Sequence, residues 1–314
     1  MNTIHDIEAA AARLVGQVHR TPLVSTRSLG ERTGTRLFLK AECLQRTGSF
    51  KVRGALNRIA TMDRAALERG LIGVSAGNHA QALAYAARAA GVHCTVVMPA
   101  NAAAAKVAAS EAYGAHVVLH GTVFDAFARM QELRSQHGYT LVHPFDDDAV
   151  IAGQGTVGLE IHEDLPDVDV VLVPVGGGGL LAGVATALRA RRPGVRIIGV
   201  EPHGAAALTA ALAAGRVVRL ERVETIADGL SAPMSGERVL AHVRGVVDDV
   251  VLVSDDAIAD AMRMLIERTK LLVEPAAAAG YAALASGVID ARDRTVAIIL
   301  SGGNIGIERL KALL

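Results

Sequence analysis

Short apolar runs alternate with segments of helical periodicity along most of this chain, and this alternation constrains the fold more than any other feature. In one instance, an almost wholly apolar run from Val168 to Val175 is followed by Gly176 to Gly179 and a helical pattern from Leu180 to Arg191. A strand that is apolar at successive positions has both faces covered, as in a parallel sheet flanked by helices. The alternation therefore predicts an α/β fold of mainly parallel, twisted sheets with helices on both faces.

The same pattern predicts the individual elements, and the length of 314 residues predicts about two domains. Strands are expected at 36–41, 71–75, 94–98, 115–119, 140–143, 168–175, 195–200, 250–253 and 295–300. Helices are expected at 4–18, 52–60, 79–90, 102–113, 123–136, 151–162, 180–191, 255–270 and 275–285. The aromatic residues Tyr113, Phe124 and Phe127 are expected in the core. Ligands of parallel α/β sheets lie at the carboxyl ends of strands, which directs attention to the loops at Ser75, Gly176 and Ser301.

Composition and charge exclude several classes of function. Lys and Arg number 32, as do Asp and Glu, and this zero net charge argues against a nucleic-acid or membrane partner. The two cysteines, Cys43 and Cys94, are too few for a disulfide framework and are expected to be free thiols in a reducing compartment. Charged residues in the first 17 positions exclude a signal-peptide core, and the apolar runs are too short to cross a bilayer. A cytoplasmic location is expected.

One lysine, Lys51, stands between the turn-forming Gly48-Ser49 and a helical run that begins at Val52. The positive end of a helix dipole and apolar neighbours such as Phe50 and Leu56 both lower the pKa of an amine. A lysine with a lowered pKa is what Schiff-base chemistry requires. The local pattern alone leaves open the alternative of an ordinary surface lysine beside a helix start.

The four glycines Gly176 to Gly179 follow a strand and open a helix. Backbone N–H groups without side chains can close on a ligand there, and the helix dipole favours an anion, so the loop predicts phosphate binding. The stretch also fits a dinucleotide fingerprint, because Gly177, Gly179 and Ala182 have the required spacing and Glu201 ends the next strand. An NAD-dependent oxidoreductase is therefore a competing interpretation.

Two serines also follow predicted strands. The segment Gly73-Val-Ser75-Ala-Gly77 matches the nucleophile elbow of serine hydrolases, although no oxyanion segment precedes it. It continues as Asn78-His79, at a helix start whose N–H groups suit a carboxylate. Ser301 opens the turn Ser301-Gly-Gly-Asn304, where a hydroxyl can hydrogen-bond a ring nitrogen of a ligand. A fourth cluster, Glu160 with His162, Glu163 and Asp164, resembles a metal set but is expected to be a solvated helix end.

Together these features describe a site for pyridoxal phosphate. The sequence resembles the fold-type II pyridoxal-phosphate enzymes, in particular the branch of threonine/serine dehydratases (threonine ammonia-lyases) and serine racemases. The resemblance covers nearly the whole chain, through His19 to Leu23, Thr47 to Asn57, Ser75 to Gln81, Ile151 to Thr156, Gly176 to Leu180, Thr225 to Gly229, Glu274-Pro275 and Ser301 to Asn304. It implies a tryptophan synthase beta-like fold with the cofactor in a cleft between two domains.

The resemblance implies a role for each residue of these loops. Lys51 would hold the cofactor covalently and, once freed by the substrate, act as general base. The cofactor-binding residues would be Lys51, Phe50, Asn78, Gly176, Gly177, Gly178, Gly179, Leu180, Glu274 and Ser301, of which 176–180 would bind the phosphate. The substrate carboxylate would be received by Ser75, Ala76, Gly77, Asn78 and His79.

Two positions separate branches of the family. Serine racemases resemble one another in a loop whose second serine acts as a second acid and base, and here that position is Ala76, which favours elimination alone. Metal-activated members bind a divalent cation through a glutamate and an aspartate six residues on. Here Glu201 is present but Ala207 replaces the aspartate, so no metal site is expected beyond a weak one at Glu201.

The activity that the resemblance implies is dehydration and deamination of L-threonine or L-serine to 2-oxobutanoate or pyruvate plus ammonia. The alternatives are a serine or aspartate racemase, a dehydratase of hydroxyaspartate or another hydroxyamino acid, and the oxidoreductase that would use the 177–182 loop. A large domain of 1–69 and 147–314, a small substrate-binding domain of 70–146 and no C-terminal regulatory domain are expected. By the same analogy the protein would be a homodimer or homotetramer.

Overall fold

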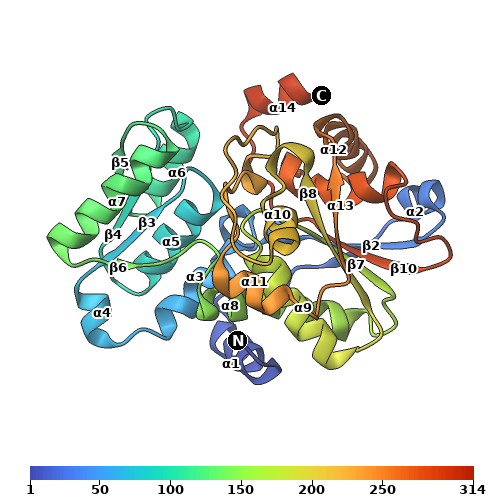
Figure 1. Ribbon diagram of the computed structural model, residues 1–314, viewed down its shortest axis with the longest axis horizontal. Coiled ribbons are helices and arrows are strands. Elements are labelled where there is room, and N and C mark those ends of the chain that lie inside the picture. The colour runs from blue at the N-terminus through green and yellow to red at the C-terminus, as the bar shows by residue number, and fades with distance from the viewer.

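Two sheets organise the chain in the computed structural model, which describes residues 1–314 (Figure 1). The larger sheet has six strands in the order β1-β2-β10-β7-β8-β9, and the smaller has four in the order β5-β4-β3-β6. Every pairing is parallel except that of β1 with β2. The predicted α/β fold with mainly parallel sheets is confirmed. The strands are β1 Leu23–Ser25, β2 Arg36–Lys40, β3 Leu71–Val74, β4 Cys94–Met98, β5 His116–Leu119, β6 Thr140–Leu141, β7 Val170–Pro174, β8 Arg196–Pro202, β9 Asp249–Val253 and β10 Thr295–Ile299.

Helices cover both sheets and separate most of the parallel strands. They are α1 Ile4–Leu14, α2 Arg27–Thr33, α3 Lys51–Ala60, α4 Arg64–Glu68, α5 Asn78–Ala89, α6 Ala104–Ala112, α7 Val123–His137, α8 Asp148–Asp164, α9 Gly179–Arg191, α10 Ala207–Ala214, α11 Glu237–Val243, α12 Asp255–Thr269, α13 Pro275–Ala285 and α14 Ile307–Leu313. Short 3₁₀ turns lie at 42–44, 46–48, 203–205 and 228–230. None of these helices combines the length and apolar character needed to span a bilayer.

Strand order brings two of the predicted loops to neighbouring positions. Strand β10, the last in the chain, pairs with β2 on one side and with β7 on the other. Because these strands are parallel, their carboxyl ends lie at one edge of the sheet. Ser301 follows β10 and Gly176 follows β7, so the two loops lie at that same edge.

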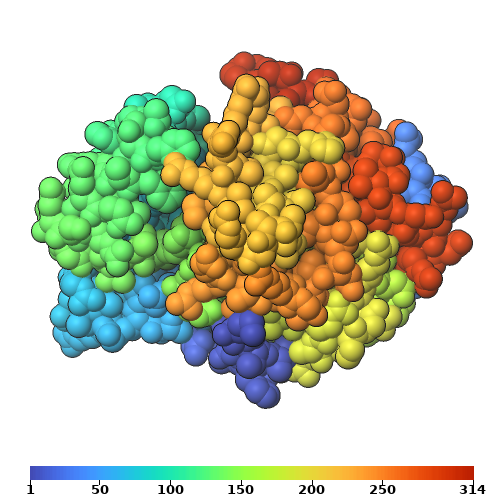
Figure 2. Space-filling view, in the orientation of Figure 1, coloured from blue at the N-terminus to red at the C-terminus, as the bar shows by residue number.

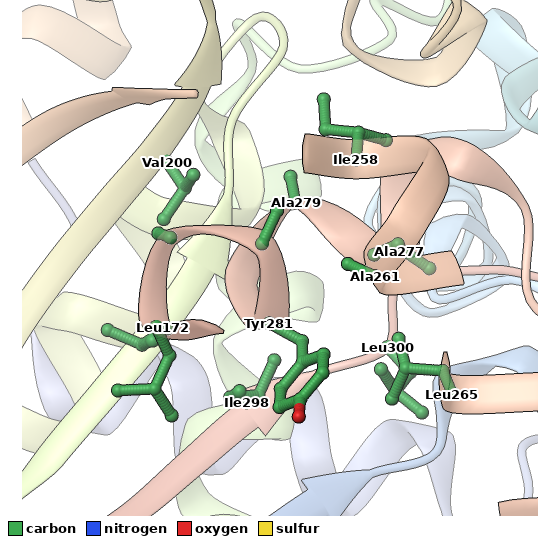
Figure 3. Close-up of a cluster of buried hydrophobic side chains, with 14 of the residues drawn as sticks. Leu172, Val200, Ile258, Ala261, Leu265, Ala277, Ala279, Tyr281, Ile298 and Leu300 are labelled. Atoms are coloured by element: carbon green, nitrogen blue, oxygen red, sulfur yellow. The ribbon is translucent and has the colours of Figure 1, made fainter. Parts of the chain in front are cut away.

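The core of the larger sheet is built from small aliphatic side chains. Helix α13 is buried along nearly its whole length, with Ala277 and Ala279 packed among Leu172, Ile298 and Leu300 (Figure 3). Its close approach to the sheet depends on small residues, since a Cβ at Gly280 would lie 2.7 Å from the Ile298 side chain. Only 3% of the residues are aromatic, and Tyr281 is the one aromatic ring in this cluster.

Several element predictions need correction. The antiparallel strand β1 and the short helices α2, α4, α10, α11 and α14 are absent from the prediction. The first helix ends at Leu14 rather than at residue 18, and α8 begins at Asp148 rather than at residue 151. The early start of α8 has a local cause, because the Asp147 carboxylate caps it by accepting hydrogen bonds from Ala149 N and Val150 N.

The prediction that Phe124 and Phe127 belong to the core is wrong. They are 49% and 36% exposed on α7, whereas Tyr113 packs partly buried against the core of the smaller sheet. The guanidinium carbon of Arg219, from the segment before α11, lies 4.2 Å from the Phe124 ring centroid. Lys106 of α6 and Asp228 form an ion pair of 3.1 Å between the same two regions. In Figure 2 the yellow-orange surface of this segment lies against the green surface of the smaller sheet's helices.

Candidate functional site

Lys51 is the first residue of α3, and its amine is in a desolvated setting. Nζ donates a hydrogen bond of 2.7 Å to the carbonyl oxygen of Pro144 and lies 5.2 Å from the Phe50 ring centroid. Burial lowers the pKa of Lys51 to about 8. A surface lysine would keep its hydration, so the structure favours the reactive-amine interpretation. The charge of Lys51 in turn helps burial to lower the pKa of His79 to about 3, which keeps that ring neutral.

Backbone contacts join the lysine segment to the turn after β10. Ser49 and Gly302 form an isolated β-bridge, Phe50 N donates to Ser301 O at 3.1 Å, and Gly303 N donates to Gly48 O at 2.9 Å. Ser301 is 3% exposed, and its hydroxyl has no hydrogen-bond partner within the chain. The structure thus brings Lys51 and Ser301 together, as the strand-end argument predicts.

Asn78 and Glu274 form the next part of the same cluster. Asn78 Nδ2 donates to Glu274 Oε1 at 2.6 Å, and Asn304 Nδ2 donates to Asn78 Oδ1 at 2.8 Å. The second N–H of the Asn78 amide remains free for a ligand. Burial raises the pKa of Glu274 to about 7, against the opposing effect of the Asn78 hydrogen bond.

The glycine loop reaches the lysine through Phe145, the residue after Pro144. A Cβ at Gly177 would lie 2.2 Å from the Phe145 ring, and one at Gly179 would lie 2.8 Å from Phe145 O. Gly178 has φ +89°, and no side chain caps the start of α9. The first N–H groups of α9, including that of Leu180, are therefore offered to an anion as the sequence predicts. Gly176 packs on the backbone of Gly229, and Gly229 in turn approaches Glu274.

The Ser75 loop connects β3 to α5. Residues 75–78 are half-buried, His79 is buried, and a Cβ at Gly77 would meet nothing within 4 Å. Ser75 Oγ accepts from Gly77 N at 3.1 Å, while His79 Nε2 lies 3.0 Å from Val142 O. No histidine bonds to the Ser75 hydroxyl, so the loop lacks the serine–histidine contact on which a hydrolase depends. Its open N-terminal end of α5, with Ala76 among the half-buried residues, can receive a carboxylate.

Glu201 lies outside this cluster and already has partners. Its carboxylate accepts from Leu208 N at 2.8 Å, Thr209 N at 2.9 Å and Thr209 Oγ1 at 2.7 Å, and so caps α10. Those contacts leave it poorly placed to bind a ribose, as the dinucleotide interpretation requires. Metal binding through Glu201 stays a prediction, and no three His, Cys, Asp or Glu residues gather into a metal-binding group.

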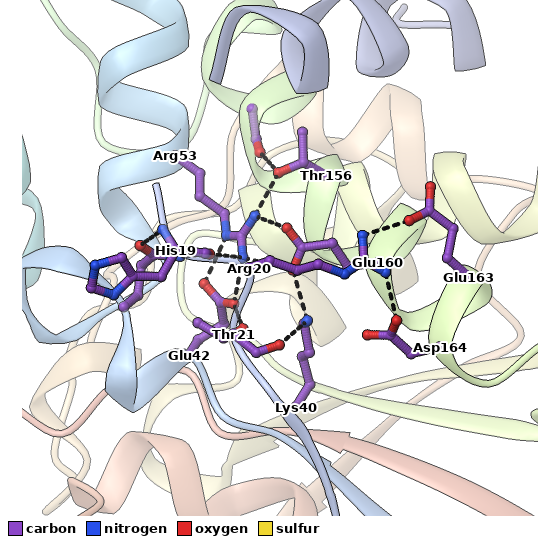
Figure 4. Close-up of polar contacts among 12 residues, drawn as sticks. His19, Arg20, Thr21, Lys40, Glu42, Arg53, Thr156, Glu160, Glu163 and Asp164 are labelled. Carbon is purple, nitrogen blue, oxygen red and sulfur yellow. Dashed lines mark hydrogen bonds and ion pairs between the residues drawn. The ribbon is translucent and has the colours of Figure 1, made fainter. Parts of the chain in front are cut away.

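A buried charge network joins α3 to α8 and to the segment after β2 (Figure 4). The sequence did not predict this network. Arg53 donates to Glu42 through Nε at 2.8 Å and Nη2 at 2.7 Å, and to both oxygens of Glu160 at 2.6 and 2.9 Å. Lys40 completes it with a 2.7 Å ion pair to Glu160. Glu160 is only 12% exposed, so its assignment to a solvated helix end is wrong, whereas Glu163 and Asp164 do pair with Arg20 at the surface.

The cluster fits a phosphorylated aromatic aldehyde on observations of this structure alone. It holds a desolvated amine at Lys51, an uncapped glycine-rich helix start at 176–179 and an unpartnered hydroxyl at Ser301. The amine can react with an aldehyde, the helix start can bind a phosphate, and the hydroxyl can hydrogen-bond a pyridine nitrogen. Pro144 and Phe145 also belong to this cluster, and the strand-end argument applied to the predicted strand 140–143 could have found them.

Comparison with known proteins gives one family throughout. A family model described as "Pyridoxal-phosphate dependent enzyme" matches residues 14–302. The L-threonine ammonia-lyase of Thermotoga maritima is 44% identical over 315 aligned residues, which cover 100% of this chain and 78% of that protein. The catabolic L-threonine dehydratase of Escherichia coli K12 is 42% identical over 313 residues, covering 99% and 95%.

Solved structures agree with the sequence matches. The structure of maize serine racemase superposes with a TM-score of 0.94 at 40% identity and covers 99% of this chain and 96% of that chain. The chain is therefore similar to both dehydratases and racemases at comparable identity.

Proposed function

Because this chain belongs to the family of pyridoxal-phosphate dependent enzymes, we propose that it is an ammonia-lyase that converts L-threonine or L-serine to 2-oxobutanoate or pyruvate plus ammonia. Identities of 42–46% with threonine ammonia-lyases and dehydratases over nearly the full chain support this reaction. The single observation that carries the proposal is the desolvated Lys51 amine, which contacts Pro144 beside the glycine loop.

Pyridoxal phosphate, when bound, supplies a conjugated ring that withdraws electrons from the α-carbon of an amino acid. Lys51 would hold it, with the N–H groups of residues 176–180 at the phosphate, Asn78 at the ring oxygen, Ser301 at the pyridine nitrogen and Glu274 and Phe50 along the ring. The neutral Ser301 hydroxyl can donate one hydrogen bond without bringing a charge to the ring.

The chain's own residues then bind the substrate and move its protons. A Lys51 pKa near 8 leaves a useful fraction of neutral amine at mildly basic pH, so Nζ can accept the α-proton. The hydrogen bond to Pro144 O would orient that amine. The open start of α5, from Ser75 to His79, would receive the substrate carboxylate, which fixes the face from which the proton leaves.

Racemase activity is the second candidate, because maize serine racemase is 40% identical. Racemisation requires a proton donor on the face opposite Lys51, and the resemblance puts Ala76 at the position of that donor. A methyl group cannot donate a proton, so we favour elimination. A hydroxyaspartate or other hydroxyamino-acid dehydratase remains an alternative within the same chemistry.

A substrate panel tests the proposal directly. The purified protein, loaded with pyridoxal phosphate, is given L-threonine, L-serine and 3-hydroxyaspartate, and 2-oxo acid, ammonia and D-amino acid are measured. We expect 2-oxo acid and ammonia in equal amounts, and Lys51→Ala should lose both this activity and the absorption band of the lysine-bound cofactor. D-amino acid without 2-oxo acid would overturn the lyase in favour of a racemase. A colourless protein that NAD stabilises would instead favour the oxidoreductase.

The remaining proposals concern organisation. We infer a small substrate-binding domain of residues 70–146 and a large domain of 1–69 and 147–314, supported by the separate sheets that these ranges contribute. A homodimer or homotetramer is proposed by analogy and is tested by sedimentation. A cytoplasmic location is proposed from the two free thiols, Cys43 and Cys94.

A further inference from the structure

A cavity of about 530 Å³ opens in the region of the smaller sheet, away from the cluster around Lys51. Its walls come from α3, the residue after α4, α7 and β6 with the residues before it, and α4, α7 and β6 lie at the left end of the molecule in Figure 1. It lies at the amino ends of β3 and β6, because its lining includes Arg69 just before β3 and Thr140 at the start of β6. The Ser75 loop follows the opposite, carboxyl end of β3.

The charged residues that line this cavity are all positive. Arg58, Arg69 and Arg134 line it, and no carboxylate does. Only Arg58 has an ion pair, with Nε 2.8 Å from Asp147 Oδ2 at the end of α3. The side chains of Arg69 and Arg134 make no hydrogen bond or ion pair, and neither do those of Gln131 and Ser135 beside them.

The neighbouring arginines behave differently. Arg64 on α4 pairs with Glu68 at 2.7 Å, and Arg129 on α7 pairs with Glu132 at 2.9 Å. These two arginines, which do not line the cavity, have carboxylate partners, whereas Arg69 and Arg134, which do line it, have none.

We propose that this cavity binds a small polyanion, a polyphosphate or polycarboxylate with at least two charged groups. A guanidinium group binds phosphate or carboxylate oxygens through paired hydrogen bonds, and the two free guanidinium groups of Arg69 and Arg134 suit two such anionic groups. The volume falls within the range of small-molecule sites and exceeds what one phosphate would fill. Gln131 and Ser135 add neutral donors to the lining.

The position of Arg58 gives the bound anion a path to the rest of the molecule. Arg58 and Lys51 lie on the same helix, and Asp147, the partner of Arg58, caps the start of α8. A polyanion that drew Arg58 towards itself would compete with Asp147 for the guanidinium. Binding would then weaken the ion pair that joins α3 to the start of α8.

The test is a calorimetric titration of the cofactor-loaded protein at fixed ionic strength, with sodium pyrophosphate in one arm and citrate in the other. Loading the cofactor keeps the glycine loop from contributing a second phosphate site. The double variant Arg69→Gln/Arg134→Gln should raise the dissociation constant of the tighter-binding ligand by about tenfold or more. The matched control Arg64→Gln/Arg129→Gln, which removes the same charge from α4 and α7 at positions outside the cavity lining, should bind like the wild type.

The two arms identify the source of the anion, since pyrophosphate and citrate differ in shape but share the chemistry. The proposal would be overturned if neither ligand gave a binding heat. It would also be overturned if the two double variants lost the same affinity, because the loss would then reflect the general reduction of positive charge. Thermal melting of each variant checks folding, and Arg134→Lys serves as a milder substitution that keeps the charge. Since the readout is binding heat, failure here would leave the lyase proposal unaffected.

Discussion

The amine of Lys51 and the backbone carbonyl of Pro144 are joined by a hydrogen bond of 2.7 Å. Lys51 begins α3, whereas Pro144 lies three residues beyond the last strand of the smaller sheet. A movement that displaced Pro144 relative to α3 would therefore break this hydrogen bond. This contact ties the protonation of the lysine to the relative positions of two parts of the fold.

The buried lysine predicts a pH-dependent stability in the cofactor-free protein. The pKa of Lys51 is about 8 when folded against 10.5 when exposed, so between these values the unfolded chain holds more protons and stability rises with pH. Below pH 8 the folded protein carries the whole cost of the buried ammonium. Lys51→Met should therefore be more stable than the wild type at pH 7, by up to about 3 kcal/mol. Urea unfolding from pH 7 to 10.5 measures the gap, which should shrink with pH; a constant gap would contradict the burial effect.

The buried carboxyl group of Glu274 should make stability fall, rather than rise, with increasing pH. Its pKa is about 7 when folded against 4.5 when exposed, so its stabilising contribution is complete below pH 4.5 and is lost as pH rises through 7. Glu274→Gln keeps an oxygen that can accept from the Asn78 amide but removes the charge. Above pH 7 its free energy of unfolding should exceed that of the wild type by about 3 kcal/mol. Unfolding of the cofactor-free proteins at several pH values measures this, with exposed Glu221→Gln as control. A Glu274→Gln protein that follows the wild-type pH curve would refute the prediction.

Arg53 is expected to be a stability determinant of α3. Arg53→Met would leave the carboxylates of Glu42 and Glu160 buried without their main partner, at a cost of about 3–5 kcal/mol. Arg53→Lys keeps the charge but not the paired hydrogen bonds, so its stability should lie between those of the wild type and Arg53→Met. The exposed pair of Arg64 and Glu68 supplies the control, since Arg64→Met should cost only about 0.5 kcal/mol. Equal losses for Arg53→Met and Arg64→Met would show that burial does not matter here.

The residue opposite Lys51 should decide between elimination and racemisation. Ala76→Ser would place a hydroxyl in the half-buried loop where the resemblance implies a second acid and base, and D-serine should then form from L-serine. Chiral chromatography of the product measures it, and Ala76→Gly, which also alters the loop but adds no proton, should give none. The assignment of faces fails if Ala76→Ser still forms 2-oxo acid but no D-serine.

Gly178 should be the least replaceable glycine of the phosphate loop for backbone reasons. Its φ of +89° disfavours any other residue, and a Cβ there would lie 2.5 Å from Val239 Cγ1. Gly178→Ala should lower cofactor affinity, by up to the roughly 1–3 kcal/mol that a strained backbone costs, because the loop of the free variant can relax away from the strained conformation. Gly194→Ala, where a Cβ would meet nothing within 4 Å, is the matched control. Equal cofactor affinity in both variants, measured by equilibrium dialysis, would contradict this explanation.

The fold and the main loops could be predicted because their signals are local. Apolar runs such as 168–175 reveal parallel strands, and strand ends then locate Ser75, Gly176 and Ser301 without any coordinates. The boundary of α8 was also readable in principle, since Asp147 is a typical capping residue. Short helices such as α4 and α11 contain too few turns for a periodic pattern to emerge.

The missing parts of the site depend on contacts between distant residues. Pro144 acts through a backbone carbonyl, which leaves no mark in the identity of a side chain. Arg53 lies 11 positions from Glu42 and 107 from Glu160 in the chain, so their pairing has no local pattern. Phe124 was assigned to the core on its aromatic character alone, whereas Arg219 meets it at the surface of α7.

The position of β10 between β2 and β7 has a consequence for biosynthesis. The four strands of the smaller sheet come from residues 71–141, so that sheet can form while the rest of the chain is still being made. The larger sheet lacks its connecting strand until residues 295–299 have left the ribosome, and until then β2 and β7 each present an open edge. Ser301 follows directly, so the last strand to emerge both closes those edges and completes the site.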